Sequence, residues 1–432
     1  DCVVKKFIYE SKILYGSLVK WILFASITGI IVGTSTSIFL KLLDYSLNLT
    51  HSLSPFYFVL MPFAFLLSVF LVKTFAKDAE GHGTEKIIEA VHKKDGNMNI
   101  LVVPVKLAAT IITIVFGGSA GKEGPSAQIG AAIMSSISNL LKLSKEDRKK
   151  LVICGISAGF GAVFGTPISG AIFAIEVLFI GSILYEVLLP SFISAIISVE
   201  IAKHFGLHHH SYKLDTPSIS DTKLYLLTII AGIIFSIIGY IFIQVLEKFE
   251  HISHKYNNFP YRKAIIASIL IVIIGLVGGK DSLGLSTESM YSSLNGNLGH
   301  WYTPFLKIIT TSLTLGFGGS GGILTPIFVV GSTSGSLIGY LFHSDIAFFA
   351  GLGLVSLLAG TANTPLAAIL MSIELFGVSI TPFASLCSII SFILIGHRSV
   401  YPTQILNMNK STSFDMKMGE EIKNTRLKKR RK

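Results

Sequence analysis

The chain has 432 residues, of which 51% are hydrophobic and only 14% are charged, whereas a soluble domain carries about 25% charged residues. This composition, with a mean hydropathy of +0.66, excludes an ordinary soluble protein and predicts an integral, multi-pass membrane protein. The net charge of +11 does not indicate a nucleic acid partner, because the basic residues collect in loops and in the C-terminal run RLKKRRK, as is typical of cytoplasmic segments of membrane proteins.

The N-terminal segment, residues 1–17, contains too many charges for a secretory signal peptide. We therefore expect it in the cytoplasm, together with the basic C-terminal tail of residues 411–432. Two cytoplasmic termini require an even number of membrane crossings. The membrane in question is expected to be the cell membrane.

Residues 18–410 hold long stretches without Asp, Glu, Lys or Arg, each close to or above the length that spans hydrocarbon. We expect ten or more helical segments in one domain. Several contain internal Gly and Pro, as in GISAGFGAVFGTPISG, and such breaks persist only where protein or an aqueous pathway satisfies the backbone. Broken helices of this kind are frequent at transport sites. The stretches include 21–40, 55–72, 124–141, 151–175, 224–246, 264–279 and 375–396.

The sequence repeats itself. GGSAGKEGPSAQIG (117–130) and GGSGGILTPIFVVG (318–331) share the pattern GGSxGxxxPxxxxG at an offset of 318 − 117 = 201 residues. A second pair of segments, 155–176 and 353–374, matches at an offset of 353 − 155 = 198. Two motifs in one order at one spacing indicate an internal duplication, which is common in transporters. We place one repeat at about 18–210 and the other at about 220–410.

Two acidic residues close the second pair of motifs, Glu176 and Glu374. Glu176 resembles a proton relay at the end of a membrane segment, but its counterpart occupies the same place in the other half. A structural role at helix ends therefore explains both residues better than proton transfer does.

The glycine-rich segments each precede a helix. Proline is favoured in a first helical turn, so we expect helices to begin near Pro125 and Pro326, and a third after Gly81–Thr84. Helix N-termini bind anions through free N–H groups without a full cation. If the three ends converge, they form an anion site that the Glu123 carboxylate can itself occupy as a tethered gate. The alternative is an ion pair between Lys122 and Glu123 at a membrane surface.

These motifs resemble the ClC family of chloride channels and chloride/proton exchangers over nearly the whole membrane domain. The resemblance implies that Glu123 in GKEGP is the gate and proton-coupling residue. It further implies anion contacts from GKEGP, from GHGTEK, from the GGILTP loop and from SVYPTQ. The anion-binding residues are then His82, Gly83, Lys122, Gly124, Ile323, Leu324 and Tyr401.

The resemblance also implies an all-α fold with two inverted-topology repeats, broken and re-entrant helices, and a homodimer with one pore in each subunit. Large family members carry cytoplasmic nucleotide-binding domains after the last helix. We expect none here, because only about thirty residues follow Tyr401.

Departures from the family pattern are also informative. His82 stands where a serine is usual, Leu324 replaces a phenylalanine, and Lys122 replaces an arginine. Exchangers of the family carry an internal proton-accepting glutamate at the position of Val177, and valine cannot carry a proton. We therefore expect a voltage- or pH-gated chloride channel, with a chloride/proton antiporter as the alternative.

Other functions are less consistent with the sequence. The fluoride/proton antiporters of the family carry an acid at the position of Ile323, so fluoride is a minor alternative. An intramembrane enzyme lacks a recognisable nucleophile or metal set, and a cation transporter requires more acids in its spans. We expect neither a metal nor a cofactor, since Cys2, Cys154 and Cys387 show no ligand spacing and the histidines near 204–210 fit a loop.

Overall fold

A computed structural model describes residues 2–425 of the protein, and in this part of the chain it contains sixteen α-helices and one small sheet. Among the described residues, six helices are long and apolar enough to cross a membrane. The basic run 426–432, on which the expected location of the C-terminus partly depends, lies outside the described residues. The architecture is the expected all-α membrane fold, built from two inverted repeats with broken helices.

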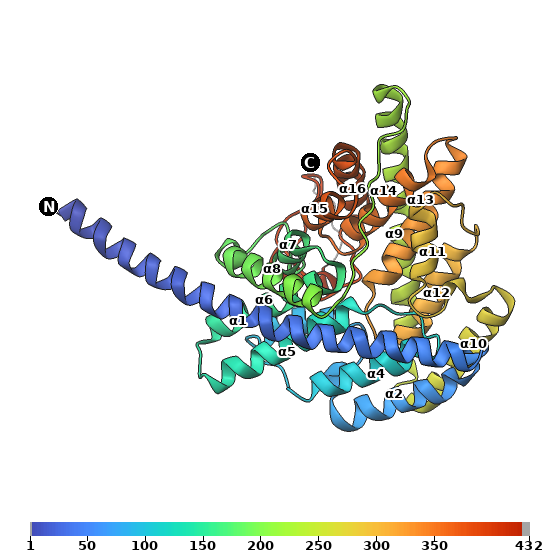
Figure 1. Cartoon of the computed structure of the whole chain (residues 1–432), viewed down its shortest axis with the longest axis horizontal. Helices are drawn as coiled ribbons and strands as arrows, with labels where there is room; N and C mark the ends of the chain where they lie inside the picture. Colours follow the sequence, from blue (N-terminus) through green and yellow to red (C-terminus); the bar gives the residue numbers. More distant parts are fainter. Residues whose placement is uncertain (1, 426–432) are drawn as a thin grey trace.

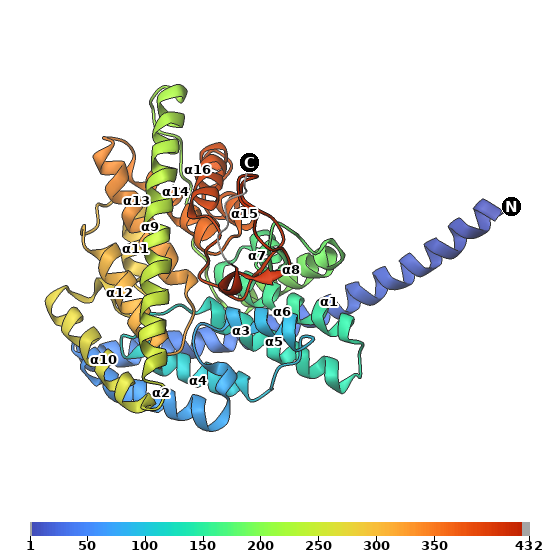
Figure 2. The ribbon, with the colours of Figure 1, turned by 180° about the vertical axis from the view of Figure 1, so that it is seen from behind.

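Within residues 2–425 each half of the chain contains eight α-helices. Figures 1 and 2 show how they are arranged. The first half comprises α1 (Cys2–Leu53), α2 (Met61–Phe75), α3 (Thr84–Lys93), α4 (Val102–Val115), α5 (Glu123–Leu140), α6 (Lys145–Phe164), α7 (Pro167–Glu176) and α8 (Leu188–His204). The second comprises α9 (Asp221–Lys255), α10 (Pro260–Val277), α11 (Thr287–Leu294), α12 (Thr303–Gly316), α13 (Leu324–Leu341), α14 (Ile346–Thr361), α15 (Pro365–Phe376) and α16 (Thr381–Ile395).

Glycines let the central helices of each repeat cross in backbone contact. A Cβ on Gly155 of α6 would lie 2.8 Å from the carbonyl oxygen of Gly130 in α5, and Gly353 of α14 meets Gly331 of α13 in the same way. In each half, one of the two glycines is the last residue of the first repeated motif (Gly130 or Gly331) and the other is the first residue of the second motif (Gly155 or Gly353). Small residues serve this purpose in membranes, where close backbone approach maximises van der Waals contact.

The Gly-Thr-Pro segment breaks one expected span. Residues 151–175 form two helices rather than one, because Gly165, with a left-handed φ of +70°, follows the last residue of α6 and α7 begins at Pro167. In the second half, Asn363 takes a φ of +56° between α14 and α15, and Pro365 opens the next helix. Both prolines occupy a first-turn position where the missing N–H costs no hydrogen bond.

Both ends of the described chain are joined to the membrane domain by secondary structure. Helix α1 runs through residue 17 without a break, and its N-terminal part extends beyond the packed body (Figure 1). Beyond residue 411 the chain folds back: β3 (Glu420–Glu421) pairs with β2 (Ile405–Leu406), which pairs with β1 (Phe179–Ile180). Met416 and Ile422 are buried against Ile180, so apolar side chains attach this segment to the membrane domain.

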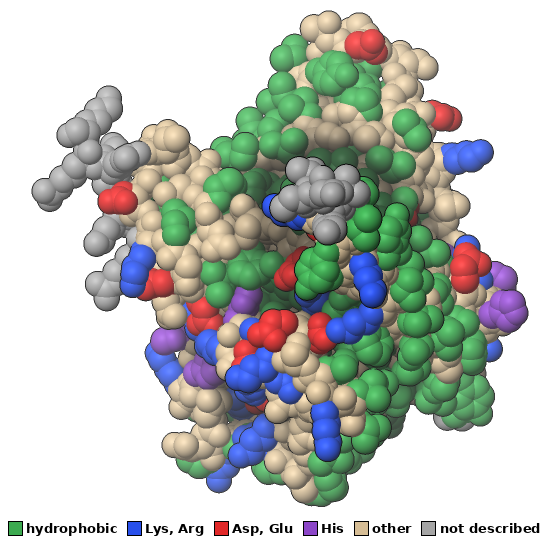
Figure 3. Space-filling view, turned by 90° about the vertical axis from the view of Figure 1, so that its left-hand side faces the viewer, with side chains coloured by type: hydrophobic (Ala, Val, Ile, Leu, Met, Phe, Trp, Pro, Cys, Tyr) green, Lys and Arg blue, Asp and Glu red, His purple; other side chains and the backbone are tan. Residues whose placement is uncertain are grey.

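The surface separates charge from apolar area. Figure 3 shows Lys, Arg, Asp and Glu side chains gathered in one zone of the face in view, beside a broad area of hydrophobic side chains. Exposed hydrophobic residues on α9 and α10 include Ile233, Ile237, Ile266 and Ile273. A surface of this kind suits lipid on the apolar area and water at the charged zone.

Candidate anion site at converging helix N-termini

Three glycine loops meet in the interior, as the repeated motifs predict. The backbone N–H of Gly121 donates to the carbonyl of Gly322 (2.7 Å), and the N–H of Gly322 donates back (2.6 Å). Gly81 forms a backbone bridge with Ser320. Gly83, at a φ of +51°, lies so close to Gly124 that a Cβ would sit 2.7 Å from the Gly124 carbonyl oxygen. The N-termini of α3, α5 and α13 therefore converge.

Reciprocal threonine contacts support the two large loops. The hydroxyl of Thr314 accepts from the N–H of Ser119, and the hydroxyl of Thr113 accepts from the N–H of Ser320, both at 3.0 Å. Each pair of equivalent residues is separated by 201 positions (314 − 113 and 320 − 119). The duplication thus holds at the level of single hydrogen bonds, and it fixes both loops against each other.

The Glu123 carboxylate occupies the N-terminus of α13. Its Oε1 accepts from the backbone N–H of Leu324 (2.6 Å) and of Thr325 (3.1 Å), and its side chain is buried. A carboxylate in this place takes the free N–H groups and the positive end of the helix dipole that would otherwise be offered to an anion. Within the described residues Lys122 forms no ion pair with Glu123, so the surface ion pair considered above is wrong.

Thr325 is a site residue that sequence reasoning missed. Its hydroxyl donates to Oε2 of Glu123 (2.6 Å), so the carboxylate receives three hydrogen bonds from two adjacent residues of α13. The only sequence signal was a hydroxyl just before Pro326, in the first turn of the predicted helix. That signal does not identify the partner, which comes from the other repeat.

We expect the Thr325→Val substitution to weaken the binding of the Glu123 carboxylate to the N-terminus of α13. The variant removes one hydrogen bond to a charged acceptor, worth about 1.5–3 kcal/mol, and thus raises the population in which the carboxylate leaves α13 by about tenfold or more. Anion flux at alkaline pH and saturating anion concentration should rise accordingly. Thr325→Ser, which keeps the hydroxyl, is the control, and equal flux from both variants would contradict this account.

Tyr401 and His82 lie side by side near the loops. Tyr401 is fully buried, and its hydroxyl has no hydrogen-bond partner among the described residues. The ring centroid of His82 lies 5.6 Å from that of Tyr401, and its Nδ1 is also buried without a described partner. Buried polar groups are normally partnered by protein or by ordered water and ligands. Both groups are thus available to an anion or to water.

Two separate cavities reach the loops around Glu123. One is small, about 90 Å³, and includes Lys122, Thr325 and Phe328 together with residues 208–210. The other, about 700 Å³, is lined by Gly81 and His82 and by many charged side chains. We call the larger cavity the vestibule. Ile323 and Leu324 are buried at the start of α13, and the backbone N–H of Leu324 donates to Glu123.

Glu176 and Glu374 cap helices of the opposite repeat. The carboxylate of Glu176 accepts from the N–H groups of Leu366 (3.0 Å) and Ala367 (2.9 Å), at the start of α15. Glu374 accepts from Ile168 and Ser169, both at 2.8 Å, at the start of α7. This reciprocal arrangement supports the structural reading of both acids. Val177 is fully buried.

Comparisons with known proteins agree with this fold. Residues 64–396 match the family model described as voltage gated chloride channel. A "Chloride/fluoride channel protein" of Pseudomonas syringae is 30% identical over 91% of this chain and 88% of its own length. An H(+)/Cl(-) exchange transporter of Yersinia pestis is 26% identical over 82% of this chain and 80% of its own. The crystal structure of a CLC-type fluoride/proton antiporter has 27% identity and a TM-score of 0.86, covering 91% of this chain and 99% of its own.

Proposed function

The protein belongs to the ClC family of voltage gated chloride channels, and from this premise we propose that it is an antiporter that exchanges a small halide anion for protons. The proposal depends on the position of the Glu123 carboxylate at the N-terminus of α13, where it receives three hydrogen bonds. When charged, Glu123 occupies the place of an anion. When protonated, the side chain is no longer attracted by the positive end of the helix dipole, and an anion can displace it.

This competition supplies the coupling. An anion can enter the site only after a proton has neutralised Glu123, and the proton is released when the carboxylate returns. If the carboxylate takes up its proton from one side of the membrane and releases it to the other, each cycle moves protons against the anion flow.

Exchange is preferred here to the passive channel expected from Val177. Two of the similar proteins bear names of proton-coupled exchangers, and Val177 excludes only one location for the internal proton acceptor. A proton path that enters elsewhere would restore coupling.

Fluoride is the first anion that we propose. The Thr325 hydroxyl adds a side-chain donor to the two backbone donors at the start of α13, and a small, strongly hydrated ion requires strong donors in place of its water. The fluoride/proton antiporter structure and the chloride/fluoride channel protein support the same choice. Ile323 does not fit this choice, because the resemblance implies an acid at this position in the fluoride antiporters of the family. Chloride is the second candidate, supported by the likeness to the exchange transporter.

We further propose a homodimer in the cell membrane with both termini in the cytoplasm. The vestibule is rich in lysine, and basic residues favour the cytoplasmic side. Its lysines are Lys73, Lys77, Lys86, Lys263 and Lys423.

Reconstitution into liposomes tests the function. Purified protein is placed in vesicles with an outward fluoride or chloride gradient, the membrane potential is clamped with valinomycin and potassium, and internal pH is recorded. We expect anion efflux to drive uphill proton entry, with fluoride faster than chloride. Anion flux without proton movement would make the protein a channel and refute the proposal, while coupling with chloride alone would refute the choice of anion.

A further inference from the structure

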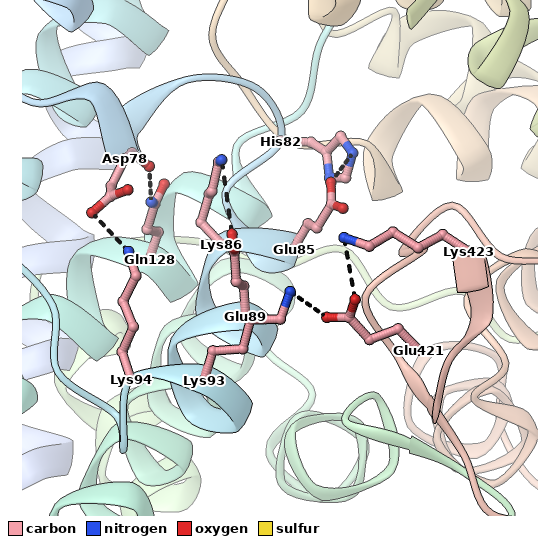
Figure 4. Close-up of polar contacts among 10 residues, drawn as sticks. All are labelled: Asp78, His82, Glu85, Lys86, Glu89, Lys93, Lys94, Gln128, Glu421 and Lys423. Atoms are coloured by element: carbon pink, nitrogen blue, oxygen red, sulfur yellow. Dashed lines mark hydrogen bonds and ion pairs between the residues drawn. The ribbon is translucent and has the colours of Figure 1, made fainter. Parts of the chain in front are cut away.

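The vestibule contains an acidic cluster around His82. The Nε2 atom of His82 lies 3.3 Å from Oε2 of Glu85 and 3.9 Å from Oε1 of Glu250. His82 comes from the glycine loop before α3, Glu85 from the first turn of α3, and Glu250 from near the end of α9. Figure 4 shows the ring of His82 and the carboxylate of Glu85 pointing toward each other.

The cluster spans the boundary between water and the protein interior. The side chains of Glu85 and Glu250 are 24% and 30% exposed and line the vestibule, whereas that of His82 is only 3% exposed. On the interior side, His82 contacts Tyr401, on which the charges of both Glu85 and Glu123 act. His82 thus stands between two water-accessible acids and the surroundings of the gate.

Glu85 and Glu250 differ from two acids that line or adjoin the same vestibule, Glu89 and Glu421, in having no cationic partner among the described residues. Glu89 pairs with Lys86, and Glu421 pairs with Lys93 and Lys423 (Figure 4). Within residues 2–425, neither Glu85 nor Glu250 has a lysine or arginine within ion-pair distance. Acids without a cationic partner can take up protons near neutral pH, and burial raises the pKa of Glu85 to about 7.

Other charged groups surround the cluster. Lys86 and Lys106 act on His82, and burial with these cations lowers its pKa to about 3. The ring is therefore neutral at rest, with one nitrogen able to accept a proton and the other able to donate. Glu247 lies beside Glu250. Three charged groups lie near Glu85, namely Glu89, Glu421 and Lys423. The other charged or titratable residues that line the vestibule are Lys73, Lys77, Glu80, His254 and Lys263.

We propose that His82, Glu85 and Glu250 form the internal proton-loading site of the exchanger. They would replace the proton-accepting glutamate that is absent at position 177, where this chain has valine. Water in the vestibule protonates one of the two carboxylates. That O–H proton passes to Nε2 of His82, while Nδ1 releases its own proton to water on the side of Tyr401, which delivers it to the Glu123 carboxylate. One proton moves from the vestibule toward the gate and the vestibule carboxylate is restored. The His82 ring is left with its proton on Nε2 in place of Nδ1, and it rotates to regain the starting arrangement before the next transfer.

The unpartnered Nδ1 atom supports the last step. It is buried, and so is the hydroxyl of Tyr401, and neither has a hydrogen-bond partner among the described residues. Buried groups of this kind in native proteins are commonly bridged by ordered water. A water at this place would connect His82 with the region of the gate.

The test measures the ratio of proton flux to anion flux in the liposome assay, since this inference rests on the proposed function. We expect the double variant Glu85→Gln/Glu250→Gln to lower this ratio at least tenfold. Glu89→Gln, which lines the same vestibule but is paired with Lys86, is the matched control and should keep the ratio of the unmodified protein. Anion flux in the same vesicles reports whether the variant is folded.

The outcomes separate the two proposals. If the unmodified protein shows no coupled proton movement, the proposed function fails. If it is coupled and the double variant keeps the same ratio, the proton-loading site is overturned. If the double variant does not fold, His82→Asn carries the test, because either carboxylate passes its proton through His82, and an unchanged ratio again overturns the assignment.

Discussion

Replacing Glu123 with glutamine is expected to abolish proton transport and leave an anion pathway that no longer responds to pH. Glutamine keeps the size of the side chain but carries neither a charge nor an exchangeable proton, so it cannot compete with an anion at α13 as the carboxylate does. Positioned proton-transfer groups contribute factors of about 10²–10⁴, and we expect the proton flux to fall by at least about 100-fold. Proton and anion fluxes recorded together in liposomes between acidic and alkaline pH measure both effects.

In the unmodified protein, anion flux should rise as the pH falls, because protonation removes the charge that holds Glu123 at the helix N-terminus. Glu200→Gln is a suitable control, since Glu200 is exposed and pairs with Lys203 on the surface. A Glu123→Gln protein that retained both proton transport and the pH response would show that Glu123 is neither gate nor proton carrier.

Introducing leucine at Gly155 or Gly353 should strongly destabilise the folded protein. In each case the new side chain would meet backbone atoms of the crossing helix, at Gly130 or Gly331 respectively, and backbone cannot move aside as a flexible side chain can. Overpacking typically costs 1–3 kcal/mol, and we expect about 3 kcal/mol at these crossings. Thermal unfolding in detergent, followed by loss of the monodisperse size-exclusion peak, measures the effect.

Gly16→Leu serves as the control for these variants. Gly16 lies in α1, and a Cβ there would have no neighbour within 4 Å. Equal stability of Gly16→Leu and Gly353→Leu would mean that the helix crossings tolerate side chains and that the glycine motifs have another cause. Because the two crossings are equivalent by duplication, we expect similar losses at Gly155 and Gly353.

The sequence alone determined the class of the protein and its duplication, and it predicted Glu123 as the gate. These features depend on local patterns: charge-free stretches, glycine followed by proline, and two motifs repeated at offsets of 201 and 198 residues. Helix starts are encoded by a few neighbouring residues, so the predicted starts near Pro125 and Pro326 agree with α5 and α13, which begin at Glu123 and Leu324. A carboxylate at one of these starts was therefore recognisable as a tethered anion.

Only the tertiary structure decided which groups meet across the two repeats. The hydroxyl of Thr325 reaches Glu123, the acids at 176 and 374 cap each other's repeats, and Glu250 approaches His82 from a distant helix. Each contact joins segments that are far apart in the chain, and no periodicity or spacing encodes the angle at which two halves pack. For the same reason the proton path could not be inferred from Val177 alone: a proton can enter wherever the fold brings unpaired acids, water and the gate together.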